Sequence, residues 1–125
     1  MKPIVTSVEE LYERKDGTGE VLLDEMAECL RKTRIIAVAD LATLMDVDAH
    51  QLNQAVRLLT GMTTRDVINR WRLLQAQDLL RQGAVGEARD ERIRRLNAAA
   101  RRCGWHSYRV LLKVAHRYGV KLEIL

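Results

Sequence analysis

Apolar residues recur along most of this 125-residue chain every three or four positions, which is the spacing of helices, and they seldom alternate as strands do. One proline, Pro3, and seven glycines separate the segments. We therefore predict an all-α fold, with the segment 120–125 as either a short strand or a strip docked on the body. The expected helices cover residues 7–14, 20–32, 38–45, 48–59, 64–81, 87–103 and 106–118.

Polar residues stand where several of these helices need caps. Ser7 and Glu10 fit a capping box at the first helix. Gly61 fits the left-handed residue that ends the fourth helix. The N-caps expected for later helices are Asp48, Thr63 or Thr64, and Ser107.

Two segments, 37–61 and 96–119, each predict a short helix, a tight turn and a second helix. Ala42 in the first segment and Ala99-Ala100 in the second are small enough for two helices to cross closely over such a turn. The second helix of each segment then turns mainly polar side chains outward. In the first these are His50, Asn53, Gln54 and Arg57; in the second they are Tyr108, Arg109, Leu112, Lys113 and Arg117.

Charge is distributed unevenly along the chain, although the formal net charge is only +4. Residues 1–50 carry 6 basic and 11 acidic side chains, whereas residues 51–125 carry 15 basic and 6 acidic ones. Thirteen of those fifteen cations are arginine, which suits bidentate contacts with phosphate and guanine. A basic half favours a polyanionic partner, and an ordinary solvated face is the alternative.

Over residues 22–119 the chain resembles the DNA-binding domain of the AraC/XylS family of bacterial transcription regulators. The resemblance depends on four short motifs that occur in the family's order. They are Leu41-Ala42, then Gly61-Met62-Thr63, then Arg72-Leu73 followed by Ala76 and Leu79-Leu80, and finally Gly104-Trp105 with Ser107.

The resemblance implies two helix-turn-helix subdomains bridged by a linker helix. The implied parts are an N-terminal extension with a short helix (1–19), the first subdomain (20–62), the linker helix (63–82), the second subdomain with its connector (83–119) and a tail (120–125). It further implies insertion of two recognition helices into successive major grooves. The implied base-reading residues are His50, Asn53, Gln54, Tyr108, Arg109 and Lys113. The implied phosphate contacts are Arg57, Arg65 and Arg117.

The chain departs from the family pattern in several places. It contains no phenylalanine. The segment from Leu80 to Gly104 is about nine residues longer than usual, and no effector-binding domain is expected in this chain. The positions where the family pattern favours aromatic core residues hold Val56, Val67, Trp105, Leu111 and Ala115 in this chain.

The same residues show no pattern for catalysis, metal binding or cofactor binding. Cys29 and Cys103 lack zinc-ligand spacing and are expected to be buried thiols in a reducing compartment. Trp71 and Trp105 are expected to anchor the core. The arginines of 89–102 are expected either to contact the DNA backbone or to pair with Glu87, Asp90 and Glu91 along the helix.

The sequence therefore predicts a cytoplasmic, nucleoid-associated regulator that binds double-stranded DNA, without enzymatic activity, cofactor or metal. We expect no secretory signal at its start, and no apolar run reaches the roughly 18 residues that a membrane span needs. The alternative is a degenerate helix-turn-helix domain that acts as a protein-protein interaction module. In either case the acidic N-terminal helices are candidates for homodimerisation or for binding a protein partner.

Overall fold

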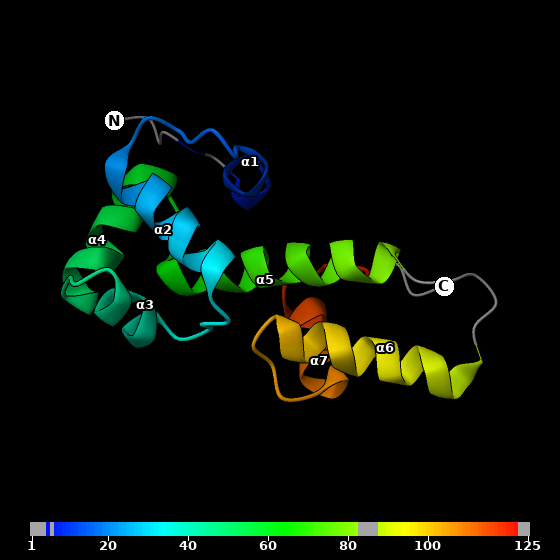
Figure 1. Cartoon of the computed structure of the whole chain (residues 1–125). Helices are drawn as coiled ribbons and strands as arrows, with labels where there is room; N and C mark the ends of the chain where they lie inside the picture. Colours follow the sequence, from blue (N-terminus) through cyan, green and yellow to red (C-terminus); the bar gives the residue numbers. More distant parts are fainter. Residues whose placement is uncertain (1–4, 6, 83–87, 123–125) are drawn as a thin grey trace. The chain divides into compact units, whose positions relative to one another are not determined.

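The computed structural model describes residues 5, 7–82 and 88–122, and within these residues it is helical and contains no strand (Figure 1). This confirms the all-α prediction for the described part of the chain. The helices are α1 (Val8–Glu13), α2 (Val21–Lys32), α3 (Val38–Leu44), α4 (Ala49–Thr60), α5 (Thr64–Arg81), α6 (Arg89–Arg102) and α7 (Tyr108–Arg117).

The chain divides into two compact units, Met1–Trp71 and Arg72–Leu125, and the boundary falls inside α5. The first unit contains α1 to α4 and the beginning of α5. The second contains the rest of α5, α6 and α7. No helix in the described part of the chain is long and apolar enough to cross a membrane.

The first unit packs α1 on α2, α2 on α3 and α3 on α4. The spacing of Leu22, Met26, Cys29 and Leu30 predicts that these four residues form the buried stripe of α2, and for Leu22 and Cys29 this prediction was wrong. Leu22 and Cys29 are only half-buried, because the buried face is rotated by about one residue. The residues that α2 buries are Leu23, Met26, Ala27 and Leu30.

Trp71 lies fully buried at the point where α5 leaves the first unit. The ring of Tyr12 meets it edge-on with the two centroids 5.0 Å apart. The guanidinium of Arg31 lies 5.3 Å from the centroid of the Trp71 ring and also donates to the carbonyl of Arg14 at 3.3 Å. The expectation that Trp71 anchors the core is confirmed.

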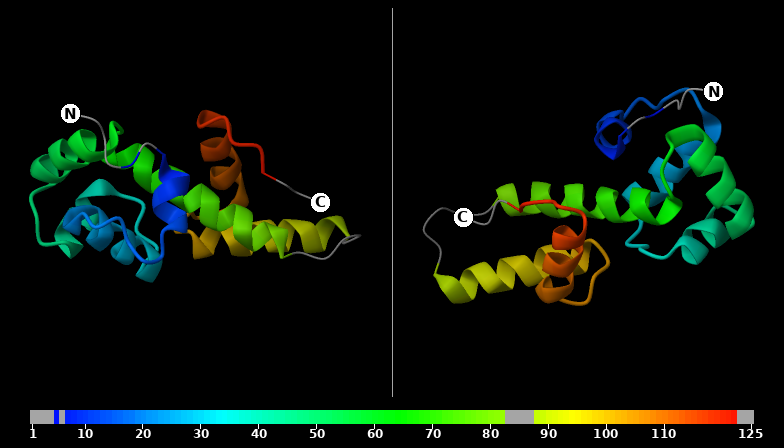
Figure 2. Two further views of the ribbon diagram at one scale, coloured as in Figure 1. Left: turned by 90° about the horizontal axis from the view of Figure 1, so that it is seen from above. Right: turned by 180° about the vertical axis from the view of Figure 1, so that it is seen from behind.

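The second unit packs α6 against α7, and α6 lies beside the second part of α5 in both views of Figure 2. Trp105 is buried as expected and supplies the aromatic volume of a core that contains no phenylalanine. Ala115 is buried in the same core. The main buried cluster consists of Leu73, Ala76, Ala100, Cys103, Trp105, Leu111, Val114 and Ala115.

Helix α5 is buried on more sides than the sequence pattern predicted. The sequence pattern predicts one apolar side, formed by Ile68, Trp71, Ala76, Leu79 and Leu80, but Arg72 is also fully buried. Its Nη1 donates to Gln75 Oε1 at 2.8 Å, and burial lowers the pKa of Arg72 to about 10. The same helix also buries three polar side chains, because its two parts belong to the cores of two units. These side chains are Thr64, Asn69 and Gln77.

Two side chains of α6 satisfy the ends of its neighbouring helices. Arg95 Nη1 donates to the carbonyl of Leu80 near the end of α5 at 2.6 Å. Asn97 Oδ1 accepts the backbone N–H of Tyr108 at the start of α7 at 2.9 Å. Ser107 occupies the N-cap position of α7 as expected, but its side chain makes no capping hydrogen bond.

Parts of the predicted connector and tail lie outside the described residues. These are Gly83 to Gly86, the helix start expected at Glu87, and residues 123–125. Within the described tail, Val120 and Leu122 pack against the core of the second unit. Val120 also donates its N–H to the carbonyl of Ala115 at 2.8 Å, which favours the docked strip over the strand for residues 120–122.

Candidate nucleic-acid interface

Helix α4 is held at both ends by the residues that the sequence predicted. Asp48 caps its start by accepting the N–H of Gln51 at 3.2 Å. Gly61 ends it in the left-handed region with φ 73°, and its N–H donates to Arg57 O at 2.8 Å. Both ends of the exposed face of α4 are therefore fixed by local hydrogen bonds.

A tight turn connects α3 to α4. Asp46 adopts a positive φ of 55°, and the N–H of Val47 donates to the carbonyl of Ala42 at 3.0 Å. Ala42 is buried, as the close crossing of the two helices requires. Leu41 next to it is also buried, so the helix before the turn is anchored in the core.

The outward face of α4 contains the side chains that the sequence placed there. Leu52, Val56 and Thr60 are buried on the opposite side, so the helix is amphipathic. His50, Asn53, Gln54 and Arg57 are exposed, and Gln51 is a further exposed polar residue of this helix. The exposed leucine on this helix, Leu58, was not singled out by the sequence pattern.

The loop from α4 to α5 is organised by two threonines. Thr60 Oγ1 donates to Val56 O at 2.7 Å and accepts the N–H of Met62 at 3.1 Å. Thr63 caps α5, because its Oγ1 accepts the N–H of Asp66 at 3.1 Å. Together they fix the first turn of α5 next to α4.

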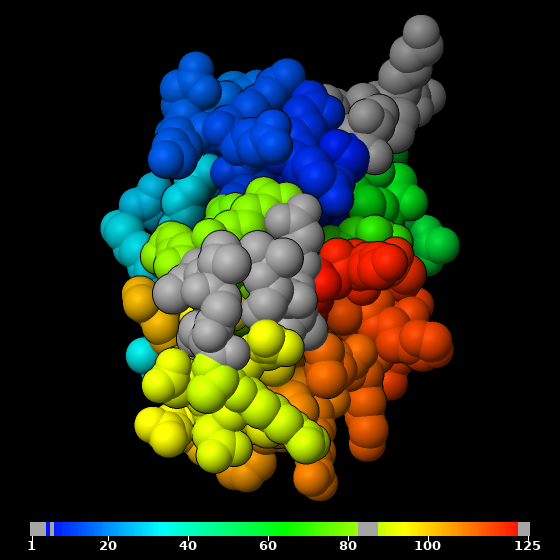
Figure 3. All heavy atoms as spheres, turned by 90° about the vertical axis from the view of Figure 1, so that its right-hand side faces the viewer, coloured from blue at the N-terminus to red at the C-terminus, as the bar shows by residue number. Residues whose placement is uncertain are grey.

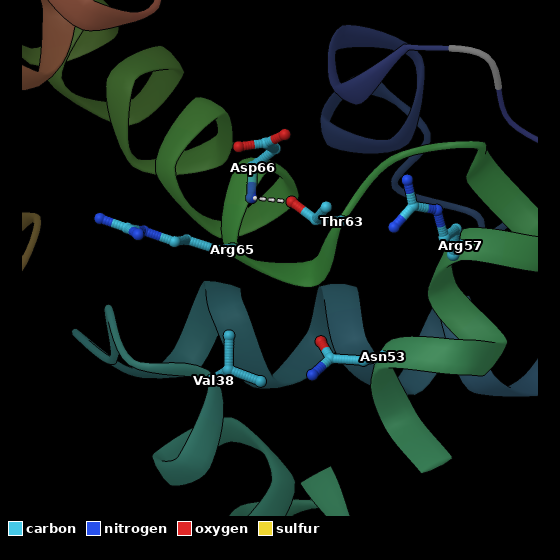
Figure 4. Close-up of a pocket in the computed structure, with 6 residues that line it drawn as sticks. All are labelled: Val38, Asn53, Arg57, Thr63, Arg65 and Asp66. Atoms are coloured by element: carbon cyan, nitrogen blue, oxygen red, sulfur yellow. Dashed lines mark hydrogen bonds between the residues drawn. The ribbon is translucent and has the colours of Figure 1, made fainter. Parts of the chain in front are cut away.

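An open hollow of about 540 Å³ lies between α4, the first turn of α5 and the beginning of α3 (Figure 4). Asn53 and Arg57 come from α4, one helical turn apart, and Arg65 comes from α5. Sequence reasoning named these three residues but did not predict that they line one hollow. The residues that line it are Val38, Asn53, Arg57, Thr63, Arg65 and Asp66.

Helix α7 provides a second exposed polar face, in the other unit. It buries Leu111, Val114 and Ala115. Figure 3 shows the side chains of α6 and α7 on adjoining parts of one surface. The exposed residues of α7 are Arg109, Leu112, Lys113, His116 and Arg117.

Tyr108 differs from the other residues that were predicted to read bases. It is half-buried and packs against the small cluster of Leu80, Leu96 and Ala99. The guanidinium of Arg109 lies 6.0 Å from the centroid of the Tyr108 ring. The tyrosine therefore connects α7 to α5 and α6 within its unit.

No group of three or more side chains able to hold a metal ion occurs among the described residues. Burial raises the pKa of the Cys103 thiol to about 11, although Arg72 opposes this shift. A buried, protonated thiol is a poor nucleophile. No protein-family model, curated protein sequence or solved structure matches this chain.

Proposed function

We propose that this protein binds double-stranded DNA sequence-specifically, as a transcription regulator of the AraC/XylS type. One observation carries the proposal: each unit contains two helices joined by a tight turn, and the second helix exposes polar and basic side chains. In helix-turn-helix proteins this second helix enters the major groove. The pairs are α3 with α4 and α6 with α7.

The exposed side chains differ in the DNA groups that they suit. His50 and Gln54 on α4, and Arg109 and Lys113 on α7, are assigned to base edges. Arg57, Arg65 and Arg117 are assigned to phosphates, which fix the position of the protein without reading sequence. Tyr108 is assigned to positioning α7, because it packs within its own unit.

The two recognition helices are proposed to enter successive major grooves, about 34–36 Å apart along the duplex. Selection of bound duplexes from a random pool tests this proposal. The expected product is a two-part motif with a spacing of about one helical turn. Recovery of a single short motif would contradict the use of both helices.

Fluorescence anisotropy with selected and randomised duplexes tests the function itself. Arg109→Ala should lose discrimination at one or two base pairs, whereas Arg57→Ala should weaken binding to all duplexes alike. Lys32→Ala is the matched control, because it removes an exposed cation that is paired with Glu28 at 2.7 Å on α2. Absence of salt-dependent binding to any duplex would refute the function.

A protein-interaction module is the second candidate, and the exposure of Leu112 favours it. Leu112 is 37 % exposed between the polar residues of α7. It suits either the methyl group of a thymine or an apolar protein partner. Replacing thymine by uracil in the selected duplex separates the two: it should weaken the wild-type protein and leave Leu112→Ala unchanged if Leu112 contacts the methyl group.

A further inference from the structure

The hollow beside α4 contains two arginines and an asparagine on its lining, which gives it the donors that an anion needs. Asn53 and Arg57 lie on one side, and the first turn of α5 lies on the other (Figure 4). Arg65 extends from that turn along the side away from Arg57. With one carboxylate among two guanidinium groups, the lining has a net positive charge.

The carboxylate of Asp66 does not close this site to an anion. Figure 4 shows it on the side of the turn that faces away from Asn53 and Val38. The backbone N–H of Asp66 is already bound to Thr63 Oγ1 at 3.1 Å. Recognition therefore depends on the side chains of Asn53, Arg57 and Arg65 and not on the free amides of a helix start.

We propose that this hollow binds phosphate, and that Asn53 belongs to the phosphate site together with Arg57 on α4, while Arg65 contributes from the opposite side. Guanidinium groups bind phosphate oxygens through paired charge-assisted hydrogen bonds, and the Asn53 amide adds a neutral donor. Because Asn53 and Arg57 lie one turn apart on α4, they are on the same side of that helix.

This assignment changes the role that the sequence gave to Asn53. A base-reading asparagine would discriminate adenine from other bases, whereas a phosphate-binding asparagine holds every sequence equally. A duplex backbone and a free phosphate ion present the same chemistry to the hollow. Binding of a phosphate of the duplex backbone rests on the proposed function, whereas binding of a free phosphate ion does not.

The first arm of the test measures duplex affinity by anisotropy for Asn53→Ala and for Gln54→Ala. Gln54→Ala is the comparison: Gln54 is an exposed neighbour on α4 that does not line the hollow and is assigned to a base edge, so its loss should be confined to selected duplexes. We expect Asn53→Ala to weaken selected and randomised duplexes by the same factor, about 3- to 10-fold. A loss confined to selected duplexes, at particular base pairs, would overturn the assignment. Both positions are exposed, and thermal melting checks that each variant is folded.

The second arm titrates the wild-type protein with inorganic phosphate and follows amide and arginine Nε–H signals by NMR. Sodium chloride at matched ionic strength is the control. We expect shifts at residues 63–66 and at Arg57 and Arg65, and their loss in Arg57→Ala. Phosphate shifts without duplex binding would refute the DNA function and support a free-phosphate site. Duplex binding without NMR shifts on addition of phosphate would refute the phosphate site in the hollow but would not contradict the DNA function.

Discussion

Asn97 Oδ1 on α6 accepts the backbone N–H of Tyr108 at a distance of 2.9 Å. The start of α7 is thus capped by a residue eleven positions earlier in the chain. The nearer candidate, Ser107, makes no capping hydrogen bond. This contact ties the exposed face of α7 to α6, so it determines where Arg109 and Lys113 are presented.

Asn97→Ala should lower the free energy of unfolding by about 1 kcal/mol, because it leaves a helix N–H without its acceptor. Asn97→Asp keeps an acceptor oxygen and should lose less. Urea denaturation followed by circular dichroism measures both. Ser107→Ala is the control, and an equal or larger loss there would show that the serine caps α7 in solution.

Arg72→Ala should be strongly destabilising, by about 2–4 kcal/mol, because it leaves a cavity where a large side chain is fully buried. Arg72→Met should cost much less. Methionine fills most of the space and avoids the free-energy cost of desolvating the guanidinium. Half-buried Gln75 can form a hydrogen bond with water instead. Equal losses in the two variants, measured by chemical denaturation, would mean that the charge itself stabilises the unit.

Asp24 should make stability depend on pH in the acidic range. Its carboxylate accepts the N–H of Thr18 at 2.6 Å, the Thr18 hydroxyl at 2.8 Å and the N–H of Gly19 at 3.1 Å. These hydrogen bonds, led by the Thr18 N–H, hold the pKa of Asp24 below its usual 3.8. A lowered pKa stabilises the fold above the unfolded-state value, and this contribution is lost as the pH falls through the folded-state value.

The wild-type protein should therefore exceed Asp24→Asn in melting temperature near neutral pH, and the two should converge as the pH falls below about 4. Thermal melting across this range measures the difference. The matched control is Asp16→Asn, which changes an exposed carboxylate on the connector between α1 and α2. A difference between the wild-type protein and Asp24→Asn that stays constant with pH would contradict this account.

The two thiols should react at different rates with a disulfide reagent. Cys103 is buried and burial raises its pKa to about 11, whereas Cys29 is only half-buried. The Cys29 thiolate is disfavoured too, since burial and then Glu25 raise its pKa. We expect Cys29 to react slowly in the folded protein and Cys103 only after denaturation. In Cys29→Ser the folded-state phase should disappear, and its persistence would show that Cys103 is accessible.

Local pattern determined most of the helices of this protein. Ser7, Asp48, Thr63 and Gly61 act where the sequence placed them, because capping hydrogen bonds join residues only three or four positions apart. The polar faces of α4 and α7 followed from periodicity in the same way, since a helix that buries one stripe exposes the other.

The remaining features depend on residues that are distant in the chain. The Asn97 cap, the Arg95 bond to Leu80 and the hollow of Asn53, Arg57 and Arg65 each require two helices to be placed side by side. Periodicity also predicted a single buried face for α5, because the spacing of apolar residues does not show that the two parts of one helix enter two cores. The sequence by itself thus determined the helices and most of their exposed residues. Only the tertiary structure decided which side chains share a site, because that depends on packing between segments and not on spacing within one.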